Sequence, residues 1–376
     1  MMIKREIKNR IIDKLKNSNK IVALFGARQV GKTTLSKEIV KELNFKTLYI
    51  NADQEKYNDI LSSRDAQKIK SLISGYELVF IDEAQRIPDI GVNLKIIHDE
   101  FPNIKIIATG SSSFELANKI VEPLTGRIWE FNLYPISILE LKQHYSDFEI
   151  NEKIEDILVF GLYPEVFTIS NLREKEELIS MISKSYLYKD VLELETIKHA
   201  DKIKKLLQLL SFQIGSEVSI FELANNLEIN KGTVDRYIDL LEKSFVIFRL
   251  GGFNRNLRKE VSKMDKIYFY DLGIRNAVID NFKGINKRND IGQLWENFLM
   301  IERKKYLSYK KINASSYYWR TTTGAELDYI EERRGDVQGF EFKYKKNKGK
   351  ISKSWLENYG GKYKLINKDN YLKFIS

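Results

Sequence analysis

The run GARQVGKTT, residues 26–34, decides the fold of this chain. It fits the pattern G-x-x-x-x-G-K-[ST], in which a glycine-rich turn presents backbone N–H groups to phosphate oxygens. The apolar residues 20–25 before it predict a buried strand, and residues 32–43 predict a helix whose positive dipole end faces the same anion. We therefore expect a phosphate-binding loop made of Gly26, Ala27, Arg28, Gln29, Val30, Gly31, Lys32, Thr33 and Thr34.

A second motif indicates that the phosphate belongs to ATP with Mg²⁺. The run ELVFIDEAQ, residues 77–85, is an apolar strand that ends in two acids. In such proteins the lysine, here Lys32, contacts the β- and γ-phosphates, and the hydroxyl of Thr33 ligates Mg²⁺. Asp82 is the expected second metal-binding group, and Glu83 is placed to polarise an attacking water as general base.

A third apolar run, residues 103–110, ends in Thr109 and is followed by serines at 111–113. In P-loop ATPases with an extra strand between the two motifs, this position senses the γ-phosphate and the attacking water. Residues 46–51 and 127–133 predict two more strands, which gives an α/β fold with a parallel sheet and helices on both faces. Ligands of such sheets bind at the carboxyl ends of the strands, where Thr33, Asp82, Glu83 and Thr109 are all expected.

Arg127 is the candidate cation for transition-state charge, as an arginine finger in cis or in trans. The alternative is a surface arginine at the start of a strand. Both interpretations stay open from the sequence.

Composition limits the remaining chemistry. The 376 residues contain no cysteine and three scattered histidines, which excludes disulfides and thiol nucleophiles and disfavours a histidine metal site. The polar start and the lack of an 18-residue apolar run predict a cytoplasmic protein that does not enter the membrane. The net charge of +10 favours nucleic acid as a partner. The densest lysine stretch, residues 343–353, is either a phosphate-contacting segment or a solvated loop.

From about residue 152 helical patterns replace the alternation of strands and helices. Residues 219–250 have a helix-turn-helix rhythm, and the apolar runs 245–250 and 266–270 predict the strands of a wing. If the second helix reads DNA, it offers Lys231, Thr233, Asp235, Arg236 and Tyr237 to the major groove. The alternative is a winged helix that serves as a lid or a protein contact.

The C-terminal part combines Glu296 on a predicted helix with Asp328, Glu341 and Lys343 on two predicted strands. This order resembles the PD-(D/E)XK core of restriction endonucleases. In that interpretation Asp328 and Glu341, with Glu296, hold a second Mg²⁺, and Lys343 orients the nucleophilic water. The alternative is a nuclease-shaped domain that binds without cutting, because Glu341 and Lys343 are also what the solvated face of a half-buried strand would carry.

Five stretches together resemble a widespread prokaryotic group of AAA-superfamily ATPases, related to archaeal and STAND-type ATPases: GARQVGKTT, VFIDEAQ, IIATGSSS, LTGR…LYPIS and GLYPEV. The resemblance covers essentially the whole chain and implies three parts: an ATPase domain at 1–150, a helical and winged-helix region at 151–285, and a restriction-endonuclease-like domain at 286–376. A G-x-P motif of STAND-type proteins contacts the adenine side of the nucleotide. Its nearest match here is Gly161 with Pro164, one residue longer, which makes Pro164 the expected nucleotide contact.

Two functions follow as expectations. In the first, Mg²⁺-dependent ATP hydrolysis drives or gates the binding or cleavage of nucleic acid by the C-terminal part. In the second, the chain is a nucleotide-operated switch or scaffold whose inactive nuclease-like part binds protein partners.

Overall fold

The computed structural model describes residues 3–110, 124–186, 200–254, 264–321, 323–345, 353–360 and 362–376. Two groups of residues singled out above, the serines at 111–113 and the lysines at 346, 348 and 350, lie outside the described residues.

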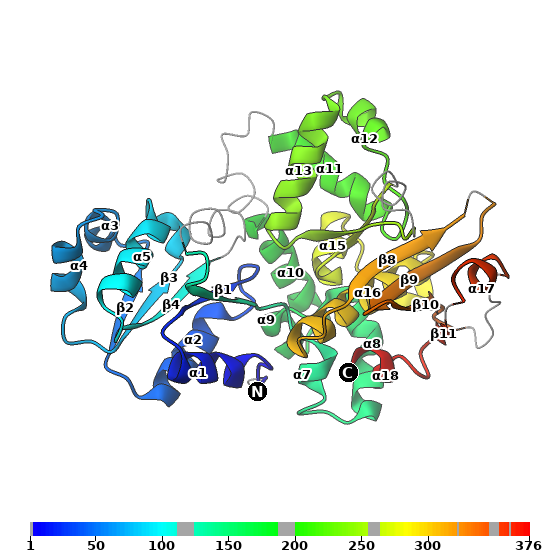
Figure 1. The fold of residues 1–376 in the computed structure, drawn as a ribbon. Coiled ribbons are helices and arrows are strands. Elements are labelled where there is room, and N and C mark those ends of the chain that lie inside the picture. Colours follow the sequence, from blue (N-terminus) through cyan, green and yellow to red (C-terminus); the bar gives the residue numbers. More distant parts are fainter. Residues whose placement is uncertain are drawn as a thin grey trace.

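A five-stranded parallel sheet forms the first part of the molecule (Figure 1). Its strands in spatial order are β2 (Thr47–Asn51), β3 (Leu78–Asp82), β4 (Lys105–Gly110), β1 (Ile21–Phe25) and β5 (Ile128–Asn132). Strand β4 pairs with both β1 and β3, so it is the additional strand between the phosphate-loop strand and the acidic strand. All of β1 is buried, as expected for a parallel strand covered on both faces. The predicted α/β parallel sheet is confirmed.

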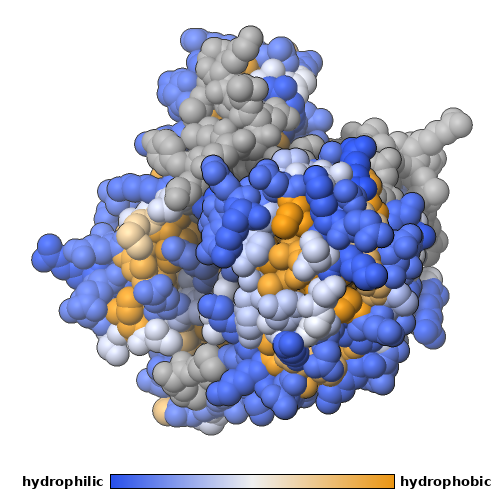
Figure 2. Space-filling model, turned by 90° about the vertical axis from the view of Figure 1, so that its left-hand side faces the viewer, coloured by the Kyte–Doolittle hydropathy of each residue, from blue (hydrophilic) through white to orange (hydrophobic). Residues whose placement is uncertain are grey.

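Helices cover this sheet. They are α1 (Lys8–Asn17), α2 (Lys32–Leu43), α3 (Glu55–Leu61), α4 (Ala66–Ile73) and α5 (Ile90–Glu100), with a 3-10 turn, η1, at Ala84–Arg86. Helices α1 and α2 contact each other and reach the sheet at β1 and β4, and α4 contacts both α3 and α5. Seen from the side of this sheet, the surface is mainly hydrophilic, with separate apolar areas (Figure 2).

Within the described residues, the middle of the chain is helical apart from one antiparallel pair of strands, which we call the hairpin. Its helices are α7 (Ile138–Leu141), α8 (Asp147–Phe160), α9 (Pro164–Thr168), α10 (Leu172–Tyr186), α11 (Ala200–Phe212), α12 (Ile220–Leu227), α13 (Lys231–Lys243) and α15 (Leu272–Val278), with a 3-10 turn, η4, at Ile285–Lys287. Strands β6 (Ile247–Leu250) and β7 (Lys266–Phe269) pair antiparallel. Tyr237 on α13 is 1% exposed, so the structure corrects the expectation that it faces a DNA groove.

The C-terminal part is a four-stranded sheet against one long helix, α16 (Ile291–Tyr309). The spatial order is β11 (Lys362–Ile366), β10 (Asp336–Phe342), β9 (Glu326–Arg333) and β8 (Ser315–Arg320), and two short helices, α17 (Lys353–Tyr359) and α18 (Leu372–Ile375), follow β10 and β11. Strand β9 runs antiparallel to both β8 and β10, and β11 is parallel to β10. The two strands expected to carry Asp328 and Glu341 are therefore adjacent.

The C-terminal part is joined to both preceding parts. Tyr318 on β8 donates its backbone N–H to the Gly251 carbonyl (3.0 Å) and accepts from the N–H of Phe253 (2.6 Å), which links it to the end of β6. Helix α16 reaches the segment after β5, where the backbone N–H of Ile138 donates to Glu302 (2.7 Å) and Lys305 donates to the Ile136 carbonyl (2.9 Å). The C-terminal part is therefore anchored through α16 to the segment that follows the parallel sheet.

Within the described ranges, no helix combines the length and the apolar character that a membrane crossing requires.

Candidate functional site

The phosphate loop runs from the end of β1 to the start of α2, as the sequence predicts. Gly26 has φ +154°, and a Cβ there would lie 2.2 Å from the carbonyl oxygen of Leu133, so no larger residue fits. Gly31, immediately before the helix, has φ +98°, which favours glycine. Gln29 also has a positive φ, at 60°. These dihedrals give the tight turn that a phosphate cradle needs.

Lys32 lies inside this loop. It is 5% exposed, and its ammonium donates to the carbonyls of Gly26 (2.8 Å) and Ala27 (2.9 Å). A cation held within the concavity of the loop can turn to phosphate oxygens over a short distance. The loop therefore has both elements of a phosphate site, backbone N–H groups and a positive charge.

Thr33, Asp82, Glu83 and Thr109 meet at the carboxyl ends of β3 and β4 beside this loop. The Thr33 hydroxyl donates to the Asp82 carboxylate, at 2.9 Å and 3.2 Å to its two oxygens. Thr109, fully buried, donates its hydroxyl to the same carboxylate and accepts from the backbone N–H of Glu83 at 3.3 Å. All four predicted residues thus lie together.

The pair Thr33 and Asp82 fits Mg²⁺. This ion is usually held by one or two protein oxygen ligands while nucleotide phosphates and waters supply the others. A hydroxyl and a carboxylate 2.9 Å apart beside a phosphate loop are such a set. When bound, the ion would neutralise charge on the phosphates.

Glu83 is positioned by a neighbour that the sequence analysis did not select. Its backbone is left-handed, with φ 54°, directly after β3. Gln85, 6% exposed, donates its side-chain amide to the Glu83 carboxylate at 2.6 Å. The sequence signal for Gln85 was its place two positions after Glu83 in the same run. Glu83 is held at the edge of the sheet and not left to rotate freely.

Pro164 lies beside the phosphate loop although 133 positions separate it from Gly31 (164 − 31). A cavity of about 420 Å³ is lined from the loop side by Val30, Gly31 and Thr34 and from α9 by Pro164 and Thr168. Pro164 is the first residue of α9, a position that suits its fixed φ. The volume is in the range of nucleotide-sized pockets. Pro164 therefore lines the same cavity as part of the phosphate loop.

Arg5 closes the other side of that cavity, and sequence reasoning missed it. Its guanidinium donates to the carbonyls of Val30 (2.7 Å) and Tyr134 (2.5 Å) and pairs with Glu140 (3.0 Å), which is fully buried. Its partners lie 25 to 135 positions away along the chain, and no local pattern announces such contacts.

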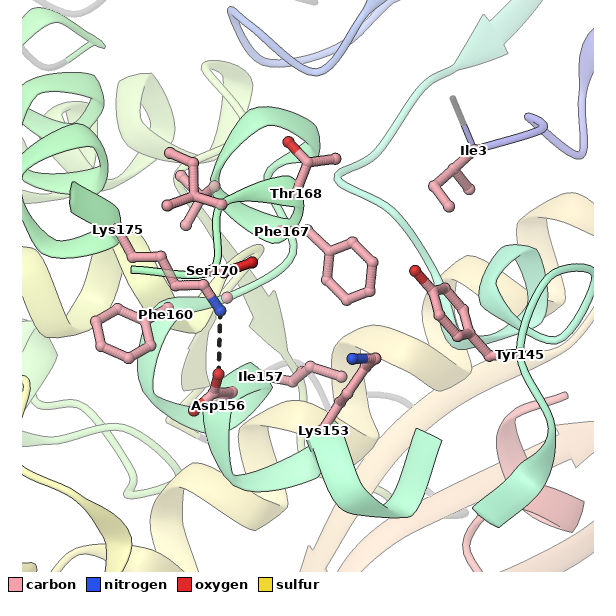
Figure 3. Close-up of a pocket in the computed structure, with 13 residues that line it drawn as sticks. Ile3, Tyr145, Lys153, Asp156, Ile157, Phe160, Phe167, Thr168, Ser170 and Lys175 are labelled. Atoms are coloured by element: carbon pink, nitrogen blue, oxygen red, sulfur yellow. Dashed lines mark hydrogen bonds and ion pairs between the residues drawn. The ribbon is translucent and has the colours of Figure 1, made fainter. Parts of the chain in front are cut away.

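A second cavity, of about 380 Å³, is lined by residues of α8, by Phe167 and Thr168 of α9 and by Lys175 of α10 (Figure 3). It shares Ile3 and Thr168 with the first cavity. Its cations are already engaged: Lys175 pairs with Asp156 at 3.0 Å, and Lys153 lies 5.4 Å from the centre of the Tyr145 ring. Of the two cavities, only the first is lined by residues of the phosphate loop.

Arg127 lies at the opposite edge of the sheet. It precedes β5, and its carbonyl accepts from the N–H of Ile21 at the start of β1, so it lies at the amino ends of the parallel strands. Its side chain pairs with Asp99 at 2.8 Å, which with His98 lowers the pKa of that carboxyl to about 2. This placement corrects the expectation of an arginine finger in cis, because the phosphate loop is at the carboxyl ends.

The predicted residues of the C-terminal part also come together. Asp328 on β9 accepts from the backbone N–H of Phe342 on β10 at 2.7 Å. Glu341 pairs with Lys343 at 3.2 Å and accepts from the Tyr363 hydroxyl. The charges of Asp328, Glu341 and Glu296 overcome the desolvation of Lys343 and raise its pKa. We call Glu296, Glu326, Asp328 and Glu341 the acidic cluster.

Two residues of β7 enter the acidic cluster, and neither was predicted from sequence to be there. Lys266 lies 2.5 Å from Glu326 and 3.5 Å from Glu296, and the Tyr268 hydroxyl donates to Glu296 at 2.6 Å. Burial, with the nearby charge of Asp328, raises the pKa of Glu296 to about 7. The alternation of β7 places Lys266 and Tyr268 on one face, which was the available signal.

The predicted second metal site does not fit these contacts. In the described part of the chain, no three acidic or histidine side chains are placed to hold a metal ion. The oxygens of Asp328 and Glu341 are bound by a backbone N–H, a tyrosine and a lysine. The cations among these acids are the ammonium groups of Lys266 and Lys343.

Comparisons with known proteins support the ATPase-like fold of the parallel-sheet part. Residues 18–142 match the AAA domain family, and residues 151–288 and 291–370 match two domains of unknown function, DUF8612 and DUF4143. An uncharacterized protein of Mycobacterium tuberculosis is 28% identical over 326 residues, 86% of this chain and 70% of its own. One of Methanocaldococcus jannaschii is 29% identical over 364 residues, 86% of this chain and 76% of its own.

Among solved structures, the Walker-type ATPase of Pyrococcus abyssi aligns with a TM-score of 0.51 at 17% identity. The alignment covers 74% of this chain and 96% of that one. At this identity the match concerns the fold. The chain contains a P-loop, AAA-like ATPase fold.

Proposed function

We propose that this protein binds ATP with Mg²⁺ at residues 26–34 and hydrolyses it. The observation that carries the proposal is the meeting of Thr33, Asp82, Glu83 and Thr109 beside Lys32. Lys32 and the loop N–H groups bind the β- and γ-phosphates, and Thr33 with Asp82 holds the ion. Pro164 and the cavity around it take the nucleoside.

Glu83 accepts the proton of the attacking water in this proposal. Gln85 orients the carboxylate of Glu83. The hydrogen bond from the backbone N–H of Glu83 to Thr109 fixes the Glu83 backbone relative to β4. General-base assistance of this kind contributes roughly 10²–10⁴-fold to a rate. Arg127 can contribute to the transition state only in trans, from a second copy.

The direct test compares Lys32→Ala with Lys37→Ala on the same helix. Lys37 is exposed, whereas Lys32 is buried in the loop. Binding of a fluorescent ATP analogue should be lost in Lys32→Ala and retained in Lys37→Ala. Equal binding by the two variants would remove the phosphate-loop assignment.

We further propose that the nucleotide state is transmitted to the C-terminal part along α16. Arg5 bonds the loop carbonyl of Val30 and the carbonyl of Tyr134, whose N–H donates to the Tyr309 hydroxyl at the end of α16 (3.4 Å). Glu296 lies near the other end of this helix, which at 19 residues is about 28 Å long. A continuous set of hydrogen bonds therefore runs from the phosphate loop to the helix that carries Glu296.

Nucleic acid is the partner that the net charge of +10 favours. The helical middle with its hairpin is consistent with a winged helix, and Lys231 and Arg236 are exposed on α13. Binding of duplex DNA should weaken steeply with salt and should weaken further when Lys231 and Arg236 are replaced by alanine. Salt-independent or absent binding would remove nucleic acid as the partner.

The second candidate is a nucleotide-operated switch or scaffold whose nuclease-like part cuts nothing. The position of Lys266 within the acidic cluster favours it. Assays of DNA cleavage with Mg²⁺ or Mn²⁺ on the wild type and Asp328→Ala separate the candidates. Cleavage that depends on Asp328 supports a nuclease, and its absence supports the switch.

A further inference from the structure

Lys266 is a buried cation contributed to the C-terminal part by another part of the chain. It is 2% exposed and stands on β7, in the hairpin of the middle part. Its ammonium lies 2.5 Å from the carboxylate of Glu326 and 3.5 Å from that of Glu296. The ring of Tyr318 lies 5.2 Å away and covers a further side of the charge. A lysine seldom occupies such a place unless it is paired.

The carboxylates around Lys266 are otherwise satisfied by protein donors. Glu296 accepts from the Tyr268 hydroxyl, and Asp328 accepts from the backbone N–H of Phe342. Burial alone would lower the pKa of Lys266, but the charges of Glu296, Glu326 and Asp328 outweigh it and raise the pKa. The ammonium is therefore held in its charged form by the same acids that a metal ion would need.

A divalent ion and this ammonium exclude each other. Mg²⁺ requires oxygen ligands at about 2.0–2.1 Å in an octahedron and keeps several waters. An ion bound by Glu296 would lie within a few ångströms of the Lys266 charge, in surroundings where like charges repel strongly. The ammonium of Lys266 already provides part of the neutralisation that the ion would bring, and Lys343, paired with Glu341, supplies a second positive charge.

We infer that Lys266 is an internal counter-ion that takes the place of a divalent metal between Glu296, Glu326 and Asp328. In the wild-type protein the acidic cluster binds no divalent cation. Because Lys266 comes from β7, the cluster is neutralised when the hairpin and the C-terminal sheet are joined, as they are through Tyr318 and Gly251. The inference concerns which cation neutralises the acidic cluster, and it does not depend on ATP hydrolysis.

The experiment titrates the full chain with Mn²⁺ in the absence of nucleotide and records binding by calorimetry. The wild type is compared with Asp328→Asn, and heat that disappears in Asp328→Asn reports the acidic cluster. We expect the two titrations to coincide. Binding by the wild type that is lost in Asp328→Asn would overturn the inference.

Replacement of Lys266 provides the second arm. Lys266→Met removes the charge with little change in volume. It should gain Mn²⁺ binding at the acidic cluster that the wild type lacks, a gain that Asp328→Asn cancels in the double variant. Lys266→Arg keeps the charge and should behave as the wild type does. A folded Lys266→Met protein, as judged by circular dichroism, without this gain would contradict the inference. If Lys266→Met does not fold, the wild-type comparison with Asp328→Asn still decides.

Discussion

The backbone N–H of Glu83 donates to the hydroxyl of Thr109 at 3.3 Å, from one strand end to the neighbouring one. The same hydroxyl donates to Asp82, so a single buried side chain contacts both consecutive acids. It fixes the backbone turn that gives Asp82 and Glu83 different directions. Asp82 accepts from the Thr33 hydroxyl, and Glu83 accepts from the Gln85 amide.

Replacement of Glu83 by glutamine should separate binding from hydrolysis. The substitution keeps the shape and the backbone bond but removes the proton acceptor, so ATP affinity should persist while the hydrolysis rate falls about 10²–10⁴-fold. Release of phosphate measures the rate, and a fluorescent ATP analogue measures the affinity. Glu55→Gln, at an exposed position on α3, is the matched control and should hydrolyse at the wild-type rate. A fully active Glu83→Gln would exclude Glu83 as the base.

Gly161 should tolerate no side chain. It has φ +75°, and a Cβ would lie 2.0 Å from a carboxylate oxygen of the buried Asp271. Gly161→Ala should therefore lower the free energy of unfolding by about 2–4 kcal/mol. Gly284→Ala is the control, because Gly284 has φ −58° and a Cβ added there would meet no atom within 4 Å, and it should change stability by less than about 0.5 kcal/mol. Urea unfolding measures both, and equal effects would contradict the steric explanation.

Asp271 should make stability depend on pH in the acidic range. Burial raises its pKa from 3.8 to about 6, against the bond from the Leu162 N–H and the charge of Lys305. The native protein thus binds this proton more tightly than the unfolded chain does. The contribution of this proton to the free energy of unfolding is full below about pH 4. It declines as the pH rises to about 6 and is constant above that pH.

Asp271→Ser removes the titrating group but keeps a side chain able to cap α15. The free energy of unfolding of the wild type minus that of Asp271→Ser should fall by about 2 kcal/mol between pH 4 and pH 6. Unfolding by urea at several pH values measures the difference. A difference that stays constant over this range would show that Asp271 is ionised throughout.

The sequence was sufficient for features that are encoded locally. The glycines and Lys32 of the loop, and the acids that end an apolar run, specify a strand, a turn and a helix without distant contacts. For Arg127 the sequence left an arginine finger and a surface arginine at a strand start both open. The structure places it at the amino ends of the strands, away from the phosphate loop. Tyr237 was predicted to face a DNA groove because the helical pattern alone did not show which face of the helix packs inward.

Lys266 and Arg5 could not be selected in this way. Lys266 meets Glu326 sixty positions further along the chain, and Arg5 meets Glu140 across 135 positions. Such pairs are set by how the middle and C-terminal parts dock and by where the N-terminal segment crosses the loop. Pro164 was found through a resemblance, and its place beside Gly31 follows from the return of the chain after α8.

The pair Glu302 and Lys305 should be essential for anchoring α16. Glu302 accepts from Lys305 (2.7 Å) and from the backbone N–H of Ile138 (2.7 Å), and both side chains are 1% exposed or less. Glu302→Gln removes the carboxylate and leaves a buried ammonium, so the free energy of unfolding should fall by about 3–5 kcal/mol.

The matched control is Glu177→Gln on α10. Glu177 pairs with Arg173 at 3.1 Å in the open, where the side chains are 67% and 88% exposed, so its loss should cost less than about 0.5 kcal/mol. Urea unfolding of both variants and the wild type gives the comparison. Equal effects would mean that the carboxylate of Glu302 contributes no more to stability than an exposed ion pair does. The expected severalfold difference in cost instead makes this pair the main polar contact through which the parallel sheet holds the helix that carries Glu296.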